Sequence, residues 1–101
     1  MGAAFVGQLI DTFVEDAQEL IATLRGALVR MDLDAFRRAA HSLKSNSETL
    51  GAVGLAVRAR ELEAMARAGS LEGAGDRIEP LVSRYEIVAQ SLGELRRGLP
   101  A

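Results

Sequence analysis

Apolar residues recur every three or four positions along most of the chain, in four successive stretches. This spacing is typical of one face of an α-helix, whereas a half-buried strand would alternate apolar and polar residues. The first stretch covers residues 3–30, and its apolar positions are Phe5, Leu9, Phe13, Ala17, Leu20, Leu24 and Leu28. The pattern therefore predicts a long amphipathic helix at the start of the chain.

Two shorter helices are predicted over residues 33–50 and 55–68. Asp32 is a favourable N-cap for the first of them. Gly51 and Gly54 indicate a turn between the two, and Gly69 ends the second. Their apolar stripes consist of Phe36, Ala39, Ala40, Leu43 and Leu50, and of Leu55, Ala59, Leu62, Met65 and Ala66.

The last stretch, residues 71–97, has the most regular pattern. Its apolar residues step strictly by three and four, as in a bundle or coiled-coil seam: Leu71, Ala74, Ile78, Leu81, Tyr85, Val88, Leu92 and Leu95. Ser70 could cap this helix, but Pro80 lies within it, so the regular helix could instead begin near Asp76 or bend at the proline.

The connections between the four segments are very short, which makes neighbouring helices antiparallel. We therefore expect an all-α fold, an antiparallel up-down-up-down four-helix bundle, formed by residues 1–101 as a single domain. The chain has 101 residues, of which 49% are hydrophobic and 26% charged, the balance of a globular protein.

Charge and composition exclude several classes of partner. The net charge is −2, arginines are spread among the acids, and aromatic residues make up only 4%. Neither a nucleic acid nor a membrane surface is indicated as a partner. There is no cysteine, no long apolar run and no signal-peptide pattern, so we expect a cytoplasmic protein.

The single histidine, His41, is the main candidate for chemistry. At 100° per residue, the apolar stripe of its helix lies on the opposite side, so the imidazole faces outward. Lys44, the only lysine, and Ser45 follow one turn later on the same polar face. Ser45 is small and leaves the imidazole accessible to a large partner.

An exposed, uncharged imidazole has a free nitrogen lone pair and can act as a nucleophile. Phosphoryl transfer requires in-line approach and charge neutralisation, and Lys44 could supply the cation. The simpler alternative is that His41 and Lys44 are ordinary solvated residues.

Other chemistries fit poorly. Asp34 and Glu48 each lie seven residues from His41, about 10 Å along the axis, and cannot share a metal ion with it. No motif marks an oxyanion hole or a phosphate-binding glycine loop. We therefore expect neither metal nor cofactor on this chain and no ATP site, so that the phosphoryl group must come from another protein or domain.

The stretch AAHSLKSNSETLGAVGLAVRARELE resembles the signature of bacterial histidine-containing phosphotransfer (HPt) domains. That signature is roughly A-H-x-L-K-G-x-x-x-x-L-G, followed by a helix that ends in a Leu-Glu pair. The matching residues are His41, Leu43, Lys44, Leu50, Gly51, Leu62 and Glu63. The family usually has Gly where this chain has Ser45. Asn46 and Ser47 lie at the borders of the buried side, where we expect small residues to let helices approach.

The resemblance implies a phosphorelay intermediate without enzymatic activity of its own. His41 would receive a phosphoryl group from the aspartate of a receiver domain, or from a histidine kinase, and pass it to a response-regulator receiver. Mg²⁺ would belong to the receiver. The partners would be receivers and a sensor histidine kinase, and the protein would be a monomer.

By the same resemblance, receivers would dock across the His41 helix and the adjacent edge of the first helix. The residues nominated for that edge are Phe5, Leu9, Thr12 and Asp16. The sequence favours another role for Phe5 and Leu9, that of covering the end of the core. Charged residues that could tune partner choice are Arg37, Arg38, Glu48, Glu63 and Arg67.

An alternative function belongs to a different class. The chain could use the HPt shape only to dock or dimerise, without phosphorylation, because the heptad of the last helix would allow pairing. His41 and Lys44 favour the phosphotransfer interpretation, since a module that only binds would need neither.

Overall fold

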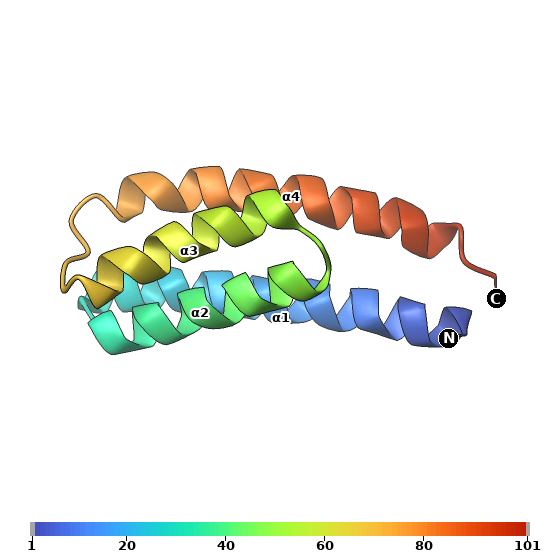
Figure 1. The fold of residues 1–101 in the computed structure, drawn as a ribbon, viewed down its shortest axis with the longest axis horizontal. Coiled ribbons are helices and arrows are strands. Elements are labelled where there is room, and N and C mark those ends of the chain that lie inside the picture. The colour runs from blue at the N-terminus through green and yellow to red at the C-terminus, as the bar shows by residue number, and fades with distance from the viewer. Residues whose placement is uncertain (1, 101) are drawn as a thin grey trace.

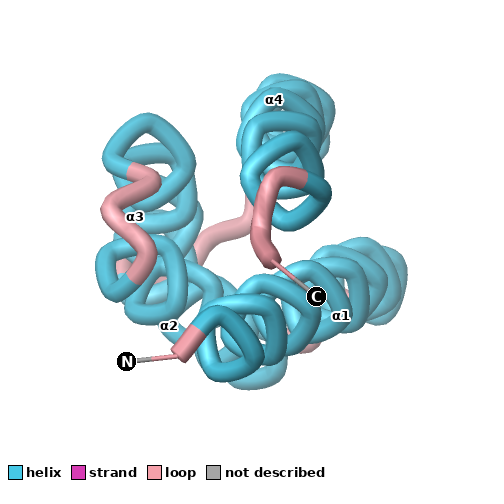
Figure 2. Tube along the Cα trace, turned by 90° about the vertical axis from the view of Figure 1, so that its right-hand side faces the viewer, coloured by secondary structure: helices cyan, strands magenta, loops and turns pink. Residues whose placement is uncertain are grey.

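The structure, a computed structural model, describes residues 2–100 and contains four helices. They are α1 (Ala3–Arg30), α2 (Leu33–Thr49), α3 (Val53–Arg67) and α4 (Gly75–Arg97). Consecutive helices run antiparallel (Figure 1). Viewed along the bundle, α1 neighbours α2 and α4, and α3 closes the ring between them (Figure 2). The predicted all-α, up-down-up-down bundle is confirmed. None of these helices is long and apolar enough to cross a membrane.

The helices differ in length, and this shapes one end of the molecule. α1 and α4 extend beyond the turn between α2 and α3, so the end that carries both termini consists of two helices (Figure 1). Phe5 and Leu9 lie there with 50% and 40% of their surface exposed. Both side chains therefore leave much of their apolar surface exposed instead of closing over the core: Phe5 lies beyond the end of α2 at Thr49, and Leu9 lies beside that end.

The core lies in the part where all four helices are present. Its largest fully buried side chains come from every helix: Leu24, Phe36, Leu43, Leu55, Leu62 and Leu81. The heptad stripe of α4 is buried only as far as Tyr85, beyond which Val88 and Leu92 are half-buried and Leu95 is exposed. The apolar stripe of α4 is therefore less buried where α3 no longer packs against it.

The helix ends follow from local chemistry. Asp32 caps α2 as predicted, since its carboxylate accepts a hydrogen bond from the Ala35 N–H at 3.0 Å. Gly51 has a φ of +75°, which reverses the chain between α2 and α3 at no steric cost. Ser70 accepts a bond from the Glu72 N–H, but it stabilises a turn and not a helix start. α4 begins only at Gly75, and Pro80 lies inside it without ending it.

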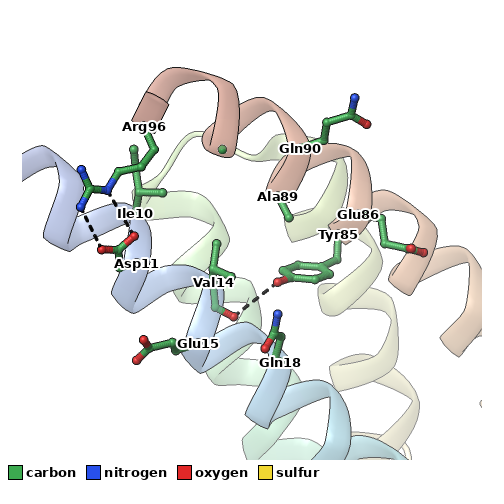
Figure 3. Close-up of a pocket in the computed structure, with 11 residues that line it drawn as sticks. Ile10, Asp11, Val14, Glu15, Gln18, Tyr85, Glu86, Ala89, Gln90 and Arg96 are labelled. Atoms are coloured by element: carbon green, nitrogen blue, oxygen red, sulfur yellow. Dashed lines mark hydrogen bonds and ion pairs between the residues drawn. The ribbon is translucent and has the colours of Figure 1, made fainter. Parts of the chain in front are cut away.

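α1 and α4 pack closely at the two-helix end. The Arg96 guanidinium lies across Gly7, where a Cβ would come within 2.7 Å of it, and pairs with Asp11 at 3.3 Å. A shallow groove follows between the helices, and the Tyr85 hydroxyl donates to the Val14 carbonyl at 3.4 Å (Figure 3). These contacts hold the long helices together on the side away from α2.

Candidate functional site

His41 lies in the middle of α2 and points outward. Half of its side-chain surface is exposed, whereas its neighbour Ala40 and the next apolar residue, Leu43, are completely buried. The helical periodicity placed the ring on this face, and the structure agrees. The imidazole is therefore accessible to a folded partner.

The inner nitrogen of the ring is held by a carboxylate from the next helix. Nδ1 of His41 lies 2.7 Å from Oε2 of Glu63, and only 5% of the Glu63 side chain is exposed. An ionised carboxylate can only accept hydrogen bonds, so Nδ1 carries the proton. The other nitrogen, Nε2, then keeps its lone pair, and no other described residue forms a hydrogen bond with it.

Two cations complete the surroundings of this carboxylate. Lys44 donates to Oε1 of Glu63 at 2.8 Å, and Arg67 donates to Oε2 at 3.1 Å. The hydrogen bond from Lys44 is the main reason that the pKa of Glu63 falls to about 2; bonds from His41 and Arg67 add to this, against burial, which raises the pKa. Glu63 is therefore ionised at neutral pH.

Glu63 differs from its expected place on the charged surface. From the sequence we expected the charge of Glu63 to tune partner choice at the surface. In the structure its side chain is instead buried against α2. It lies one turn from Ala59 and one turn from Ala66, both buried, and these small side chains leave room for it. Its spacing of four residues from Ala59 and three from Ala66 is the feature of the sequence that could have indicated an inward position.

The other charged candidates lie along the outer surface. Arg37 and Arg38 both pair with Asp34, at 3.0 and 3.2 Å, and these contacts lower the pKa of Asp34, the bond from Arg37 most strongly. Glu48 is exposed near the end of α2. All are on the same helix as His41, on either side of it along the axis.

A surface between α1 and α2 borders the histidine. Leu9, Thr12 and Asp16 of α1 face Asn46 and Thr49 of α2 across a shallow hollow. A second hollow continues from Asp16 and Asn46 to Ser42, the residue after His41. Phe5 extends this surface toward the start of α1, where it lines a further hollow with Leu9 and Thr12. We call the surface formed by Phe5, Leu9, Thr12, Asp16, Ser42 and Asn46 the α1–α2 face.

The small residues that follow His41 serve different purposes. Ser45 is exposed one turn after the histidine and leaves its flank open. Ser47 is fully buried, and its hydroxyl donates to the Leu43 carbonyl at 2.7 Å. Asn46 is half-buried between the two. The expectation that small residues there allow close packing is correct for Ser47.

This combination of features defines a class of protein: a four-helix bundle that presents one oriented, half-exposed histidine on its second helix. Residues 8–98 match the Hpt domain family. The chain therefore belongs to the Hpt domain family, the phosphotransfer modules of phosphorelays, which act as transfer intermediates and not as classical enzymes.

A solved structure supports the same assignment. The chain is similar to the crystal structure of histidine-containing phosphotransfer protein B (HptB) from Pseudomonas aeruginosa PAO1, with a TM-score of 0.90 and 38% sequence identity. The match covers 93% of this chain and 82% of HptB. A comparison with curated protein sequences finds no significant match.

Proposed function

We propose that His41 is the phosphoacceptor, and that it carries the phosphoryl group between the aspartate of one receiver domain, or a histidine kinase, and a response-regulator receiver. The observation that carries this proposal is the 2.7 Å contact between Nδ1 of His41 and the buried Glu63 carboxylate. It fixes the tautomer in which the exposed nitrogen is the nucleophile.

The proposed transfer needs no proton transfer at the attacking nitrogen. The lone pair of Nε2 forms a bond to phosphorus as the bond between phosphorus and the aspartyl oxygen breaks, and that electron pair stays on the aspartate carboxylate. The imidazole gains positive charge while Nδ1 keeps its proton, and the negative charge of Glu63 stabilises it. Transfer to the next receiver is the reverse of this step.

Lys44 and Ser45 support the step in different ways. Lys44, held 2.8 Å from Glu63, contributes a positive charge beside the incoming phosphoryl group. Ser45 contributes by being small, so that the receiver can bring its aspartate in line with Nε2. Mg²⁺ would be held by the receiver, and this chain would supply no cofactor and no ATP site of its own.

The α1–α2 face is the surface that we propose for receiver docking. Phe5 and Leu9 expose apolar area there, and Thr12 and Asp16 continue it toward the histidine. Association is usually driven by such apolar patches with a polar rim. Arg37, Arg38 and Glu48 lie on the outer side of α2, where their charges would select among receivers.

A module that only docks is the less well supported alternative. A buried carboxylate is costly unless it is fully paired, and here three donors from two helices satisfy it. That arrangement orients one ring nitrogen, which docking alone would not require.

The direct test is to incubate the protein with a phosphorylated receiver domain and to follow acid-labile, base-stable phosphate on the chain. We expect label on the wild type and none on His41→Gln. Equal labelling of the variant contradicts the proposal. So does a wild type that is not labelled by any receiver tried, including receivers whose genes adjoin the gene of this protein.

A further inference from the structure

The positive charges of the cluster around Glu63 outnumber the single negative charge of its carboxylate. Lys44 and Arg67 are both basic residues, and both donate to the single carboxylate of Glu63. With a neutral His41, the cluster therefore has an excess of one positive charge. A phosphoryl group brings close to two negative charges at neutral pH, so one of the two cations has a stronger partner available once His41 is phosphorylated.

The two cations differ in how firmly they are held. The ammonium of Lys44 lies 2.8 Å from Oε1, and only 20% of its side chain is exposed. The guanidinium of Arg67 lies 3.1 Å from Oε2, and 60% of its side chain is exposed. Arg67 and Glu63 are also four residues apart on α3, the spacing of a surface ion pair that contributes little to stability. Arg67 is therefore the cation that can leave at lower cost.

Arg67 is also placed to reach the phosphoryl group. Its guanidinium and Nδ1 of His41 donate to the same oxygen of Glu63, so the guanidinium lies beside the ring at the exposed edge of the cluster. A planar guanidinium can donate two parallel hydrogen bonds to phosphoryl oxygens, which an ammonium cannot. If Arg67 leaves, Glu63 still keeps its bonds to His41 and Lys44.

We infer that Arg67 is a phosphoryl-binding residue that exchanges partners: it pairs with Glu63 while His41 is unmodified and with the phosphoryl oxygens once His41 is phosphorylated. This inference rests on the proposed function of His41. It gives Arg67 a role within the transfer site, where the sequence indicated only a charge for partner selection. No covalent bond changes in the exchange, which moves only hydrogen bonds.

The exchange predicts a change in the phosphorylation equilibrium. A cation bound to the phosphoryl group stabilises phosphorylated His41, so Arg67→Gln shifts the equilibrium with a phosphorylated receiver toward the receiver by about threefold or more. Arg67→Lys retains the charge and restores part of the shift. Arg60→Gln is the matched control, because Arg60 is an exposed arginine on the same helix with no ion pair among the described residues.

The test starts from protein phosphorylated chemically with potassium phosphoramidate, so that it does not depend on a cognate receiver. Phosphorus NMR then gives the last pKa of the phosphoryl group, which we expect to rise in Arg67→Gln and to stay at the wild-type value in Arg60→Gln. The nitrogen resonances of the Arg67 side chain should shift on phosphorylation of the wild type.

The outcomes separate the two proposals. If His41 is modified but the phosphoryl pKa and the Arg67 resonances do not respond, the exchange is wrong while the phosphoacceptor role stands. If Arg67→Gln alters only the receiver equilibrium and leaves the phosphoryl pKa unchanged, Arg67 acts on Glu63 alone, and the exchange is again wrong. If His41 cannot be phosphorylated from any receiver, the function itself fails.

Discussion

Glu63 of α3 accepts a hydrogen bond from Nδ1 of His41 of α2 at 2.7 Å, across the interface between two antiparallel helices. The histidine is half-exposed, and its partner is almost completely buried. The exposed residue would carry out the chemistry, and the buried residue determines which nitrogen is available for it.

Replacement of Glu63 tests this relationship. In Glu63→Ala, Nδ1 loses its acceptor, both tautomers become populated, and the developing positive charge on the ring is no longer stabilised. We expect the rate of phosphoryl transfer to fall by about 10- to 100-fold, as is typical when a residue that orients a histidine is lost. Nitrogen NMR of the imidazole should show the mixed tautomers. Glu61→Ala removes a half-exposed glutamate on the same helix that pairs with Arg77; it is the control and should transfer normally. A normal rate in Glu63→Ala would contradict the positioning role.

The lowered pKa of Glu63 predicts a pH dependence of stability. The pKa is about 2 in the folded chain and 4.5 in the unfolded reference, so the stabilisation is fully present above about pH 4.5. It is lost as the pH falls from 4.5 toward 2, when the carboxylate must be protonated. We expect the difference in unfolding free energy between wild type and Glu63→Gln, about 1–3 kcal/mol at pH 7, to shrink over this window. Denaturant titrations at several pH values measure it, and a constant difference would be the contrary result.

Ser45 is predicted to act through its size. Ser45→Gly should leave the transfer rate within about twofold of wild type and destabilise α2 by about 0.5 kcal/mol. Ser45→Trp should abolish transfer from a receiver while the helical content and the melting temperature stay near those of wild type. Ser83→Trp, at an exposed serine on α4, serves as the matched control for a bulky surface residue. Efficient transfer to Ser45→Trp would show that access at this flank is unimportant.

The α1–α2 face gives a prediction about binding. Leu9→Asp should weaken the affinity for a partner receiver by about tenfold, because an exposed apolar contact is replaced by a charge that must be desolvated. Leu95→Asp changes another exposed leucine at the same end of the molecule, on α4, and should bind normally. Both variants should unfold near the wild-type temperature. A weakened affinity in Leu95→Asp alone would place the docking surface on α4.

The sequence determined the class of fold and the direction of His41. A helical period of 3.6 residues places the imidazole opposite Phe36, Ala40 and Leu43 whatever the neighbouring helices do, and the short connections impose antiparallel neighbours. The cap at Asp32 is similarly local. These features depend on residues that are close in the chain, so a single sequence is enough to predict them.

The tertiary structure decided what depends on contacts between helices. Glu63 could be recognised as the partner of His41 only once α2 and α3 were packed together, because 22 residues separate the two side chains. The exposure of Phe5 and Leu9 depends on where α2 ends relative to α1. The apolar periodicity within α1 carries no information about that position. Local periodicity determines which way a side chain points, whereas the length and packing of the neighbouring helices determine what it meets there.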